Sequence, residues 1–179
     1  MCGGFKRRST TELSLINKMY GAMNPQWEIE LNDMVKPQAT SPIIAKDEWT
    51  LSRWGFKPYW SQDVSKAFIN ARSETLDTKM TFKGAFESQR CIIPAAGFYE
   101  GGQLFSNTSG LLMAGVFSLA HGGSSYAIIT KDSNELVAKH HHRMPVLLSE
   151  DAAKAWMDSS TSKSDLKDIM RMDNVQLAI

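Results

Sequence analysis

The order of apolar and polar residues predicts a chain built mainly from short strands. Residues 42–45 and 48–51 are expected to be neighbouring strands joined by an acidic turn. Two longer β-compatible runs, 111–119 and 126–130, flank a Gly-Gly-Ser-Ser turn and predict a β-hairpin or a meander. Residues 91–94 are also expected to be extended. The pattern therefore favours a β-rich core.

Helical spacing is confined to short segments between these runs. Ser9 with Glu12 three residues later forms a capping-box pattern, and Gly21 can end the helix that it opens. Ser149 is expected to cap another helix with an acidic start. Residues 22–41 lack periodicity and are expected to be mostly loop. The other predicted helices cover residues 76–88, 132–140, 150–158 and 164–171.

Composition narrows the class of protein. The chain has 179 residues, 42% hydrophobic and 22% charged, which is typical of a globular domain with a real core. No apolar run approaches the roughly 20 residues of a membrane span, and the start of the chain lacks the layout of a secretory signal. Two cysteines do not make a disulfide framework. We expect one α+β domain over residues 1–179, cytoplasmic and monomeric.

The first four residues, Met1-Cys2-Gly3-Gly4, carry the most distinctive chemistry. Removal of Met1 would leave an α-amine and a thiol on one residue, with ordinary pKa values of about 7.7–8.0 and about 8.5. Such a 1,2-aminothiol can condense with an aldehyde and close to a thiazolidine, or its thiolate can attack an acyl carbon. The alternative is an ordinary N-terminal residue in a frayed tail. A retained Met1 would block the amine.

Three further segments each allow two interpretations. Residues 53–60 hold four aromatic rings, which could cover the edge of the core or stack on unpaired bases. Glu100 lies in an apolar and aromatic stretch, where burial would raise its pKa for proton transfer; otherwise it simply ends a strand. The run His140–His142 suggests a metal, but consecutive side chains cannot converge on one ion. A proton shuttle beside Arg143 is favoured, and neither metal nor cofactor is expected.

Taken together, these segments resemble the SOS response-associated peptidase (SRAP) family, in the family's order and over residues 1 to about 158. The matching pieces are Met1-Cys2-Gly3, Trp54-Gly55-Phe56 with Pro58 and Trp60, Asn70 to Thr75, Pro94 to Glu100, Ala114 to Phe117, Ile128 to Thr130, and His141 to Pro145. The resemblance favours a barrel-like, mainly antiparallel core with peripheral helices.

The resemblance implies a protein that processes abasic sites in single-stranded DNA, with no membrane partner. Cys2 would cross-link to the ring-opened sugar aldehyde and end as a thiazolidine. Asn70 would position Cys2, Glu100 would be the acid and base, and His141 would assist proton transfer. The residues implied on the DNA side are Arg72 and Arg143 for flanking phosphates, Trp54, and Thr130, which would also orient Glu100. The peptidase name fits self-removal of Met1 by the same thiol and base.

Several positions depart from the family pattern. Gly4 stands where an arginine is usual, Gly101 replaces a tryptophan, and the hairpin that follows looks shortened. These departures concern DNA affinity more than cross-linking chemistry. Two other functions stay open: an N-terminal-nucleophile amidohydrolase, although no Asn-Gly dipeptide occurs in the sequence, and a non-catalytic module that binds single strands through residues 54–60.

Overall fold

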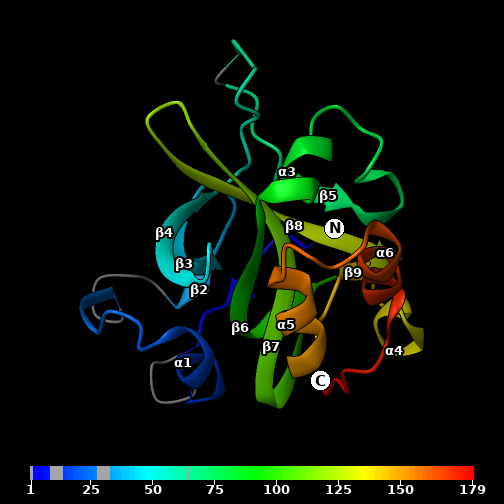
Figure 1. Ribbon diagram of the computed structural model, residues 1–179. Helices are drawn as coiled ribbons and strands as arrows, with labels where there is room; N and C mark the ends of the chain where they lie inside the picture. Colours follow the sequence, from blue (N-terminus) through cyan, green and yellow to red (C-terminus); the bar gives the residue numbers. More distant parts are fainter. Residues whose placement is uncertain (1, 9–13, 28–32, 64) are drawn as a thin grey trace.

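The centre of the molecule is a sheet closed into a five-stranded barrel (Figure 1). The computed structural model describes residues 2–8, 14–27, 33–63 and 65–179. Neighbouring barrel strands are antiparallel except β4 and β8, which run parallel. In order around the barrel, the strands are β6 (Arg90–Glu100), β3 (Thr40–Ala45), β4 (Glu48–Trp54), β8 (Gly123–Asp132) and β7 (Gln103–Ala120), which returns to β6.

Strand β7 closes the barrel because it is long enough to pair with two strands. It follows β6 from Gln103 to Val116 and pairs with β8 from Gly115 to Ala120. Gly115 lies where the three strands meet. A Cβ atom there would lie 2.4 Å from Ile93 Cδ1 and 2.9 Å from the Ala127 carbonyl oxygen. The absence of a side chain at this position therefore lets the three strands approach.

Four short strands extend the barrel and carry most of the residues implicated by the sequence. On the β6 side lie β1 (Phe5–Lys6) and β2 (Met34–Val35), with β1 hydrogen-bonded to both β6 and β2. On the β8 side lie β5 (Asn70–Arg72), which is parallel to β8, and β9 (Arg143–Pro145), which is antiparallel to it. The first of the segments that resemble the family, next to β1, and the last, which contains β9, are thus brought to neighbouring edges of one sheet.

The strands bury both faces, so adjacent apolar residues enter different clusters. Ile43 and Ile93 pack in a cluster that also holds Cys2, whereas Ile44 and Ile92 pack in a second cluster beneath the helices. Successive side chains of a strand point to opposite faces, which explains the division. The continuous apolar runs in the sequence therefore reflect strands covered on both sides.

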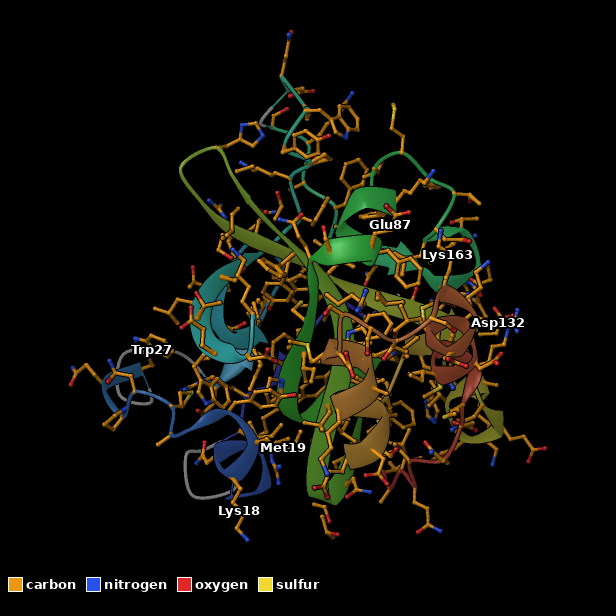
Figure 2. The ribbon with its side chains drawn as sticks, viewed as in Figure 1. Lys18, Met19, Trp27, Glu87, Asp132 and Lys163 are labelled. Carbon is orange, nitrogen blue, oxygen red and sulfur yellow. The ribbon has the colours of Figure 1, made fainter. Side chains whose placement is uncertain are left out.

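Helices cover the second cluster and the ends of the barrel. Lys163 of α6 pairs with Glu87 of α3 at 3.5 Å, which joins two helices that are far apart in the chain (Figure 2). In the part of the chain that the structure describes, no helix has the length and apolar character needed to span a membrane. The helices are α1 (Ser14–Tyr20), η2 (Ser73–Thr75), α3 (Lys83–Ser88), α4 (Glu135–Ala138), α5 (Glu150–Met157) and α6 (Lys163–Arg171).

The predicted α+β class with a β-rich, mainly antiparallel core is confirmed, and most strands lie within a few residues of their predicted places. The Ser149 cap is also confirmed, since its side chain accepts a hydrogen bond from the Ala152 N–H. The helix predicted over 76–88 is wrong in its first half, where turns precede α3. The predicted loop 22–41 contains β2 and the start of β3. The capping box at Ser9 lies outside the described residues.

Two local features fix the end of β6. Gly101 and Gly102 form a two-residue turn into β7 with φ values of 55° and 82°, the left-handed backbone that such tight hairpins require. Between Ala95 and Gly97 the β6–β7 register shifts, so that Ala95 is opposite Leu111 whereas Gly97 is opposite Ser106. The turn joins Glu100 directly to Gln103, which pair with each other.

Gly115→Ala tests the closure of the barrel. The added methyl group would overlap Ile93 and the Ala127 carbonyl, so we expect the free energy of unfolding to fall by about 1–3 kcal/mol. The matched control is Gly84→Ala in α3, where a Cβ meets nothing within 4 Å and should raise stability by about 0.5–1 kcal/mol. Urea unfolding of both variants measures the difference. Equal stability of the two would contradict the proposed role of Gly115.

Candidate active site

Cys2 lies inside the apolar cluster of the barrel and not in a frayed tail. Its side chain is fully buried, and its thiol donates to the Gly4 carbonyl oxygen at 3.6 Å. The main chain around it is anchored, because the Tyr99 N–H donates to the same Gly4 oxygen at 2.9 Å. Burial, with a smaller contribution from the Glu100 carboxylate, raises the pKa of the Cys2 thiol to about 12. The thiol is therefore protonated at neutral pH and needs a base.

Asn70 connects the N-terminal segment to β5. Its side-chain Nδ2 donates to the Cys2 carbonyl oxygen at 3.2 Å, while β5 holds Asn70 opposite Ile128 of β8. The Oδ1 atom of Asn70 is buried and accepts no hydrogen bond from the residues that the structure describes. A buried acceptor of this kind in a folded protein calls for a donor supplied by a ligand or by solvent. The Nδ2 atom of Asn70 thus holds the Cys2 main chain, while its Oδ1 atom is available to accept a hydrogen bond from a bound group.

Glu100 is the last residue of β6 and is almost completely buried. Loss of solvation raises the pKa of its carboxyl group, and the nearby His141 ring partly offsets that increase. Oε2 of Glu100 lies 3.6 Å from Nδ1 of His141. A carboxyl group with a raised pKa, beside an imidazole, suits proton transfer near neutral pH.

The Nδ1 atom of His141 has three polar neighbours. The Arg143 main-chain N–H lies 3.0 Å away and can donate to an unprotonated Nδ1, whereas the Arg143 carbonyl oxygen lies 3.2 Å away and can accept from a protonated one. The contact with Glu100 at 3.6 Å becomes an ion pair only when Nδ1 carries a proton. The tautomer of His141 therefore decides which of these neighbours its Nδ1 atom binds.

Arg143 is buried and binds two carboxylates at once. Its guanidinium contacts Glu74 through two hydrogen bonds of 2.6 and 3.0 Å, and Asp132 through one of 2.7 Å. It also donates to the Thr130 carbonyl oxygen at 2.7 Å and to Thr130 Oγ1 at 3.3 Å. Every terminal N–H of Arg143 is directed at these partners. The side chain holds β9, β8 and η2 together, next to His141.

The two arginines implied for phosphate binding differ in their surroundings. Arg72 is exposed at the end of β5, and its side chain makes no hydrogen bond or ion pair with the described residues. A phosphate at Arg143 would have to displace Glu74 or Asp132. Thr130 is buried against Arg143, and its side-chain oxygen accepts a hydrogen bond from the Arg143 guanidinium at 3.3 Å. Arg72 is therefore the accessible cation of the pair.

Trp54 belongs to the core. It is fully buried, its Nε1 donates to the Ile69 carbonyl oxygen at 2.7 Å, and its ring stacks on Tyr126 with centroids 6.4 Å apart. A base cannot reach this ring, so the core interpretation of residues 53–60 holds at Trp54. Farther along the same segment, Tyr59 is 77% exposed and Trp60 44% exposed. These two rings are the accessible aromatic surface of the segment.

A cavity of about 350 Å³ opens beside the reactive groups. Glu100 and the peptide that follows Cys2 form part of its wall. Lys36 is the cation among the described lining residues, and much of the remaining wall is glycine backbone. The residues that line the cavity are Gly3, Gly4, Met34, Lys36, Tyr99, Glu100, Gly101 and Gly102.

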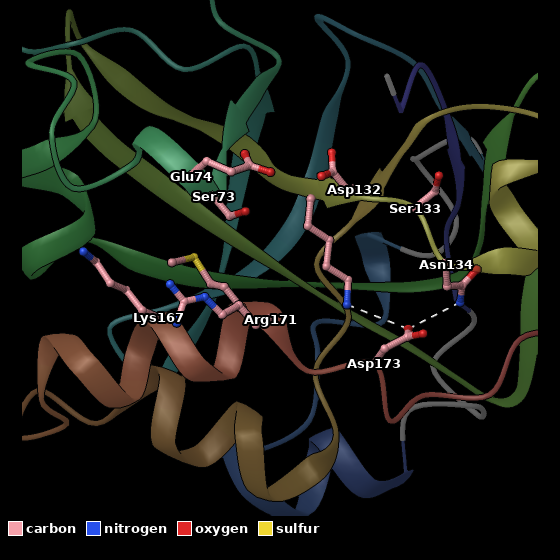
Figure 3. Close-up of a pocket in the computed structure, with 10 residues that line it drawn as sticks. Ser73, Glu74, Asp132, Ser133, Asn134, Lys167, Arg171 and Asp173 are labelled. Carbon is pink, nitrogen blue, oxygen red and sulfur yellow. Dashed lines mark hydrogen bonds and ion pairs between the residues drawn. The ribbon is translucent and has the colours of Figure 1, made fainter.

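Figure 3 shows a second cavity, of about 530 Å³, beyond Glu74 and Asp132. Its cations already face carboxylates: Lys167 lies 2.6 Å from Asp77, and Lys131 lies 3.8 Å from Asp173. Neither Cys2 nor Glu100 lines it. The second cavity therefore lies on the outer side of the Arg143 cluster.

The fold is an α+β barrel in which the buried Cys2 is held by an amide, near a carboxylate that is paired with an imidazole. The family model for the SOS response associated peptidase (SRAP) matches residues 1–178, and the chain belongs to that family.

Curated relatives carry the name abasic site processing protein. YoaM of Bacillus subtilis is 36% identical over 63% of this chain and 58% of its own length, and HMCES of Xenopus tropicalis is 29% identical over 89% and 65%. This chain thus spans about three fifths of those relatives. A crystal structure of a protein from Bacteroides thetaiotaomicron has a TM-score of 0.80 at 24% identity, covering 94% of this chain and 86% of that one, which shows the shared fold.

Sequence reasoning missed Glu74, Asp132 and Lys36. Glu74 lies within the matched segment Asn70 to Thr75, so its place beside Arg72 was a signal that could have drawn attention to it. Asp132 and Lys36 carry no local signal. Their positions depend on β8 pairing with β9 and on β2 pairing with β1, which are contacts across the fold.

Glu74→Gln tests the Arg143 cluster through the pH dependence of stability. The Arg143 hydrogen bonds lower the pKa of Glu74, so its stabilising contribution is present above the unfolded carboxyl pKa, about 4.3, and is lost as pH falls through the lower folded value. Because Glu74 is half exposed, we expect a loss of no more than about 1 kcal/mol at neutral pH. Urea unfolding at neutral and acidic pH measures it. A loss that persists at the acidic end would rule out this charge linkage.

Proposed function

We propose that this protein captures ring-opened abasic sites in single-stranded DNA as a thiazolidine on Cys2. The observation that carries the proposal is the grouping of a buried N-terminal thiol, held by Asn70, with a carboxyl group of raised pKa at Glu100. The names of the curated relatives support an abasic site as the substrate. Capture requires a free α-amine on Cys2, and hence removal of Met1.

The reaction is a condensation followed by an addition. The amine nitrogen attacks the aldehyde carbon, and the resulting carbinolamine loses water to give an imine. The thiol then adds across the C=N bond: sulfur bonds to carbon, and its proton moves to nitrogen. Because the Cys2 thiol has a pKa of about 12 in its buried setting, a base must take that proton during attack. Glu100 suits that role and, once protonated, can also assist the loss of water.

Five other residues fit supporting roles. The buried Oδ1 of Asn70, which lacks a donor among the described residues, can accept from the Cys2 amine or from a sugar hydroxyl. The His141 ring, whose Nδ1 lies beside the Arg143 main chain and 3.6 Å from Glu100, can assist proton transfer to and from that carboxyl group. Arg72, exposed next to these groups, can bind a phosphate of the strand. Tyr59 and Trp60 are the rings available to stack on unpaired bases.

Removal of Met1 is the second activity that the same groups support. The Cys2 thiol, activated by Glu100, could attack the carbonyl carbon of Met1, and the acyl group would then pass to water. This proposal accords with the word peptidase in the family name. It adds no further residue to the site.

Cys2→Ala tests the thiazolidine. The processed wild type should form an adduct with an abasic single strand that survives denaturation without a reductant. Cys2→Ala keeps an α-amine, so it can form an imine, but it lacks the sulfur that closes the ring. Its adduct should therefore persist only after borohydride reduction. Denaturing gels and intact mass report both products. An equally stable adduct in Cys2→Ala without reduction would contradict the ring-closing step.

Glu100→Gln tests proton transfer. The amide keeps the size and polarity of the side chain but cannot exchange protons, so single-turnover capture should slow by about 10²–10⁴-fold. The pH profile of the wild-type capture rate should change slope at a pH above the ordinary carboxyl pKa, about 4.3, because burial raises the pKa of Glu100. The profile of the variant should lack that change of slope. DNA affinity, measured with an intact strand, serves as the control. A wild-type rate and pH profile in Glu100→Gln would assign the role to another group.

A further inference from the structure

Residues 172–179 connect two sides of the candidate active site. After α6 they run past α4 toward β7 (Figure 1). On the β7 side, Ser106 and Ala178 exchange two main-chain hydrogen bonds of 2.9 and 2.8 Å. Asn107 Nδ2 also donates to the Gln176 carbonyl oxygen at 2.6 Å. The segment is therefore fixed to the strand that leaves the β6–β7 turn.

The beginning of the 172–179 segment is fixed to the start of α4. Asn134 Nδ2 donates to Asp173 Oδ1 at 3.3 Å, and Lys131 Nζ lies 3.8 Å from the same carboxylate oxygen (Figure 3). Lys131 Nζ also donates to the Met172 carbonyl oxygen. Between the two attachments, apolar side chains of the segment pack against the barrel cluster, as does an apolar side chain of α4. The segment thus joins β7 to α4.

A continuous set of hydrogen bonds leads from Asp173 to His141. Asn134, which donates to Asp173, is the N-cap of α4, and its Oδ1 accepts from the Val137 N–H at 3.1 Å. The Val137 carbonyl oxygen in turn accepts from the His141 N–H at 2.9 Å. Asn134 therefore uses one end of its amide to bind the 172–179 segment and the other to fix the helical turn that leads to His141.

The position of His141 matters because its contact with Glu100 is near the limit of hydrogen bonding. The atoms Glu100 Oε2 and His141 Nδ1 lie 3.6 Å apart, whereas N–H···O hydrogen bonds are usually about 2.7–3.2 Å long. A small movement of either side chain therefore decides whether a proton can pass between them. Glu100 is held by β6 and, through the turn, by β7, so a link from β7 to α4 sets the separation of the pair.

We infer that residues 172–179 are a positioning element, which holds His141 at the distance from Glu100 that proton transfer needs. The inference rests on the proposed function, because that function gives these two residues their proton-transfer roles. Among the described residues that line the cavity beside Glu100, none belongs to the 172–179 segment. The segment therefore influences capture through the residues that it positions.

Asn107→Asp tests the attachment to β7. The variant keeps Oδ1, which accepts from the Ser109 N–H at 2.7 Å, but it places a carboxylate oxygen against the Gln176 carbonyl oxygen in place of a donor. Loss of one hydrogen bond is a several-fold effect, so single-turnover capture of an abasic single strand should slow about 3- to 10-fold. Affinity for an intact strand should stay at the wild-type value.

Asn174→Asp is the matched control. It makes the same change of charge within the 172–179 segment, at an exposed side chain that forms no hydrogen bond or ion pair with the described residues. This variant should capture at the wild-type rate. Equal slowing in Asn107→Asp and Asn174→Asp, or wild-type rates in both, would overturn the inference.

A double variant separates positioning from a general loss of structure. His141→Ala removes the ring that the segment is inferred to hold. In this background, Asn107→Asp should cause no further slowing, because the two changes then act on the same contact. If Asn107→Asp slowed His141→Ala by the same factor as it slows the wild type, the segment would not act through His141.

Amide hydrogen exchange tests the inference without using capture. Asp173→Ala removes the partner of Asn134, so exchange at the His141 amide should become about 3- to 10-fold faster. Asp168→Ala is the matched control, because it removes an exposed carboxylate whose ion pair lies within α6, and it should leave that exchange unchanged. Unchanged exchange in Asp173→Ala would overturn the inference. Failure of the wild type to capture an abasic strand would instead overturn the proposed function, and exchange would still decide whether the segment holds His141.

Discussion

Closure of the sheet by β7 is the constraint on which the rest of the molecule depends. Strand β7 pairs with both β6 and β8, so these two strands, which carry or anchor the residues of the site, are held at fixed places around one barrel. β6 delivers Glu100 and anchors β1, while β8 anchors β5 with Asn70 and β9 with Arg143. As a result, Asn70 reaches Cys2, 68 positions earlier in the chain, and Glu100 lies 3.6 Å from His141.

The burial that stabilises the N-terminus also controls its reactivity. Cys2 packs among aromatic and aliphatic side chains, as an ordinary core residue would, and the same loss of solvation keeps its thiol protonated. Glu100 is also buried, and burial favours its neutral form in the same way. One apolar environment therefore raises the pKa of both groups: the thiol becomes a weaker acid, and the carboxylate becomes a stronger base. A stronger base beside a weak acid is what removal of the thiol proton during attack requires.

The sequence predicted the fold where local patterns decide it. The hairpin around Gly122, the Ser149 cap and the α+β class all follow from periodicity and turn chemistry, and the resemblance indicated which motifs meet. The sequence could not predict the burial of Trp54. Whether an aromatic ring in a loop-like segment is buried depends on the space that the other side chains leave inside the barrel. The partners of Arg143 were equally hidden. A guanidinium beside two acids and one beside a phosphate look alike in sequence, and only the β8–β9 pairing brings Asp132 to it.

The register shift at Ala96 has a consequence for which side of the sheet is reactive. Before the shift, the odd-numbered residues Cys91, Ile93 and Ala95 enter the barrel cluster; after it, the even-numbered Phe98 does. Glu100 follows Phe98 by two positions, so it shares that inward phase. An uninterrupted strand would have sent Glu100 to the opposite side, beneath neither Cys2 nor His141. A single irregular residue in the middle of β6 thus changes which residues of the strand face the barrel interior. It places the Glu100 carboxylate on the side of the strand where the Cys2 thiol lies.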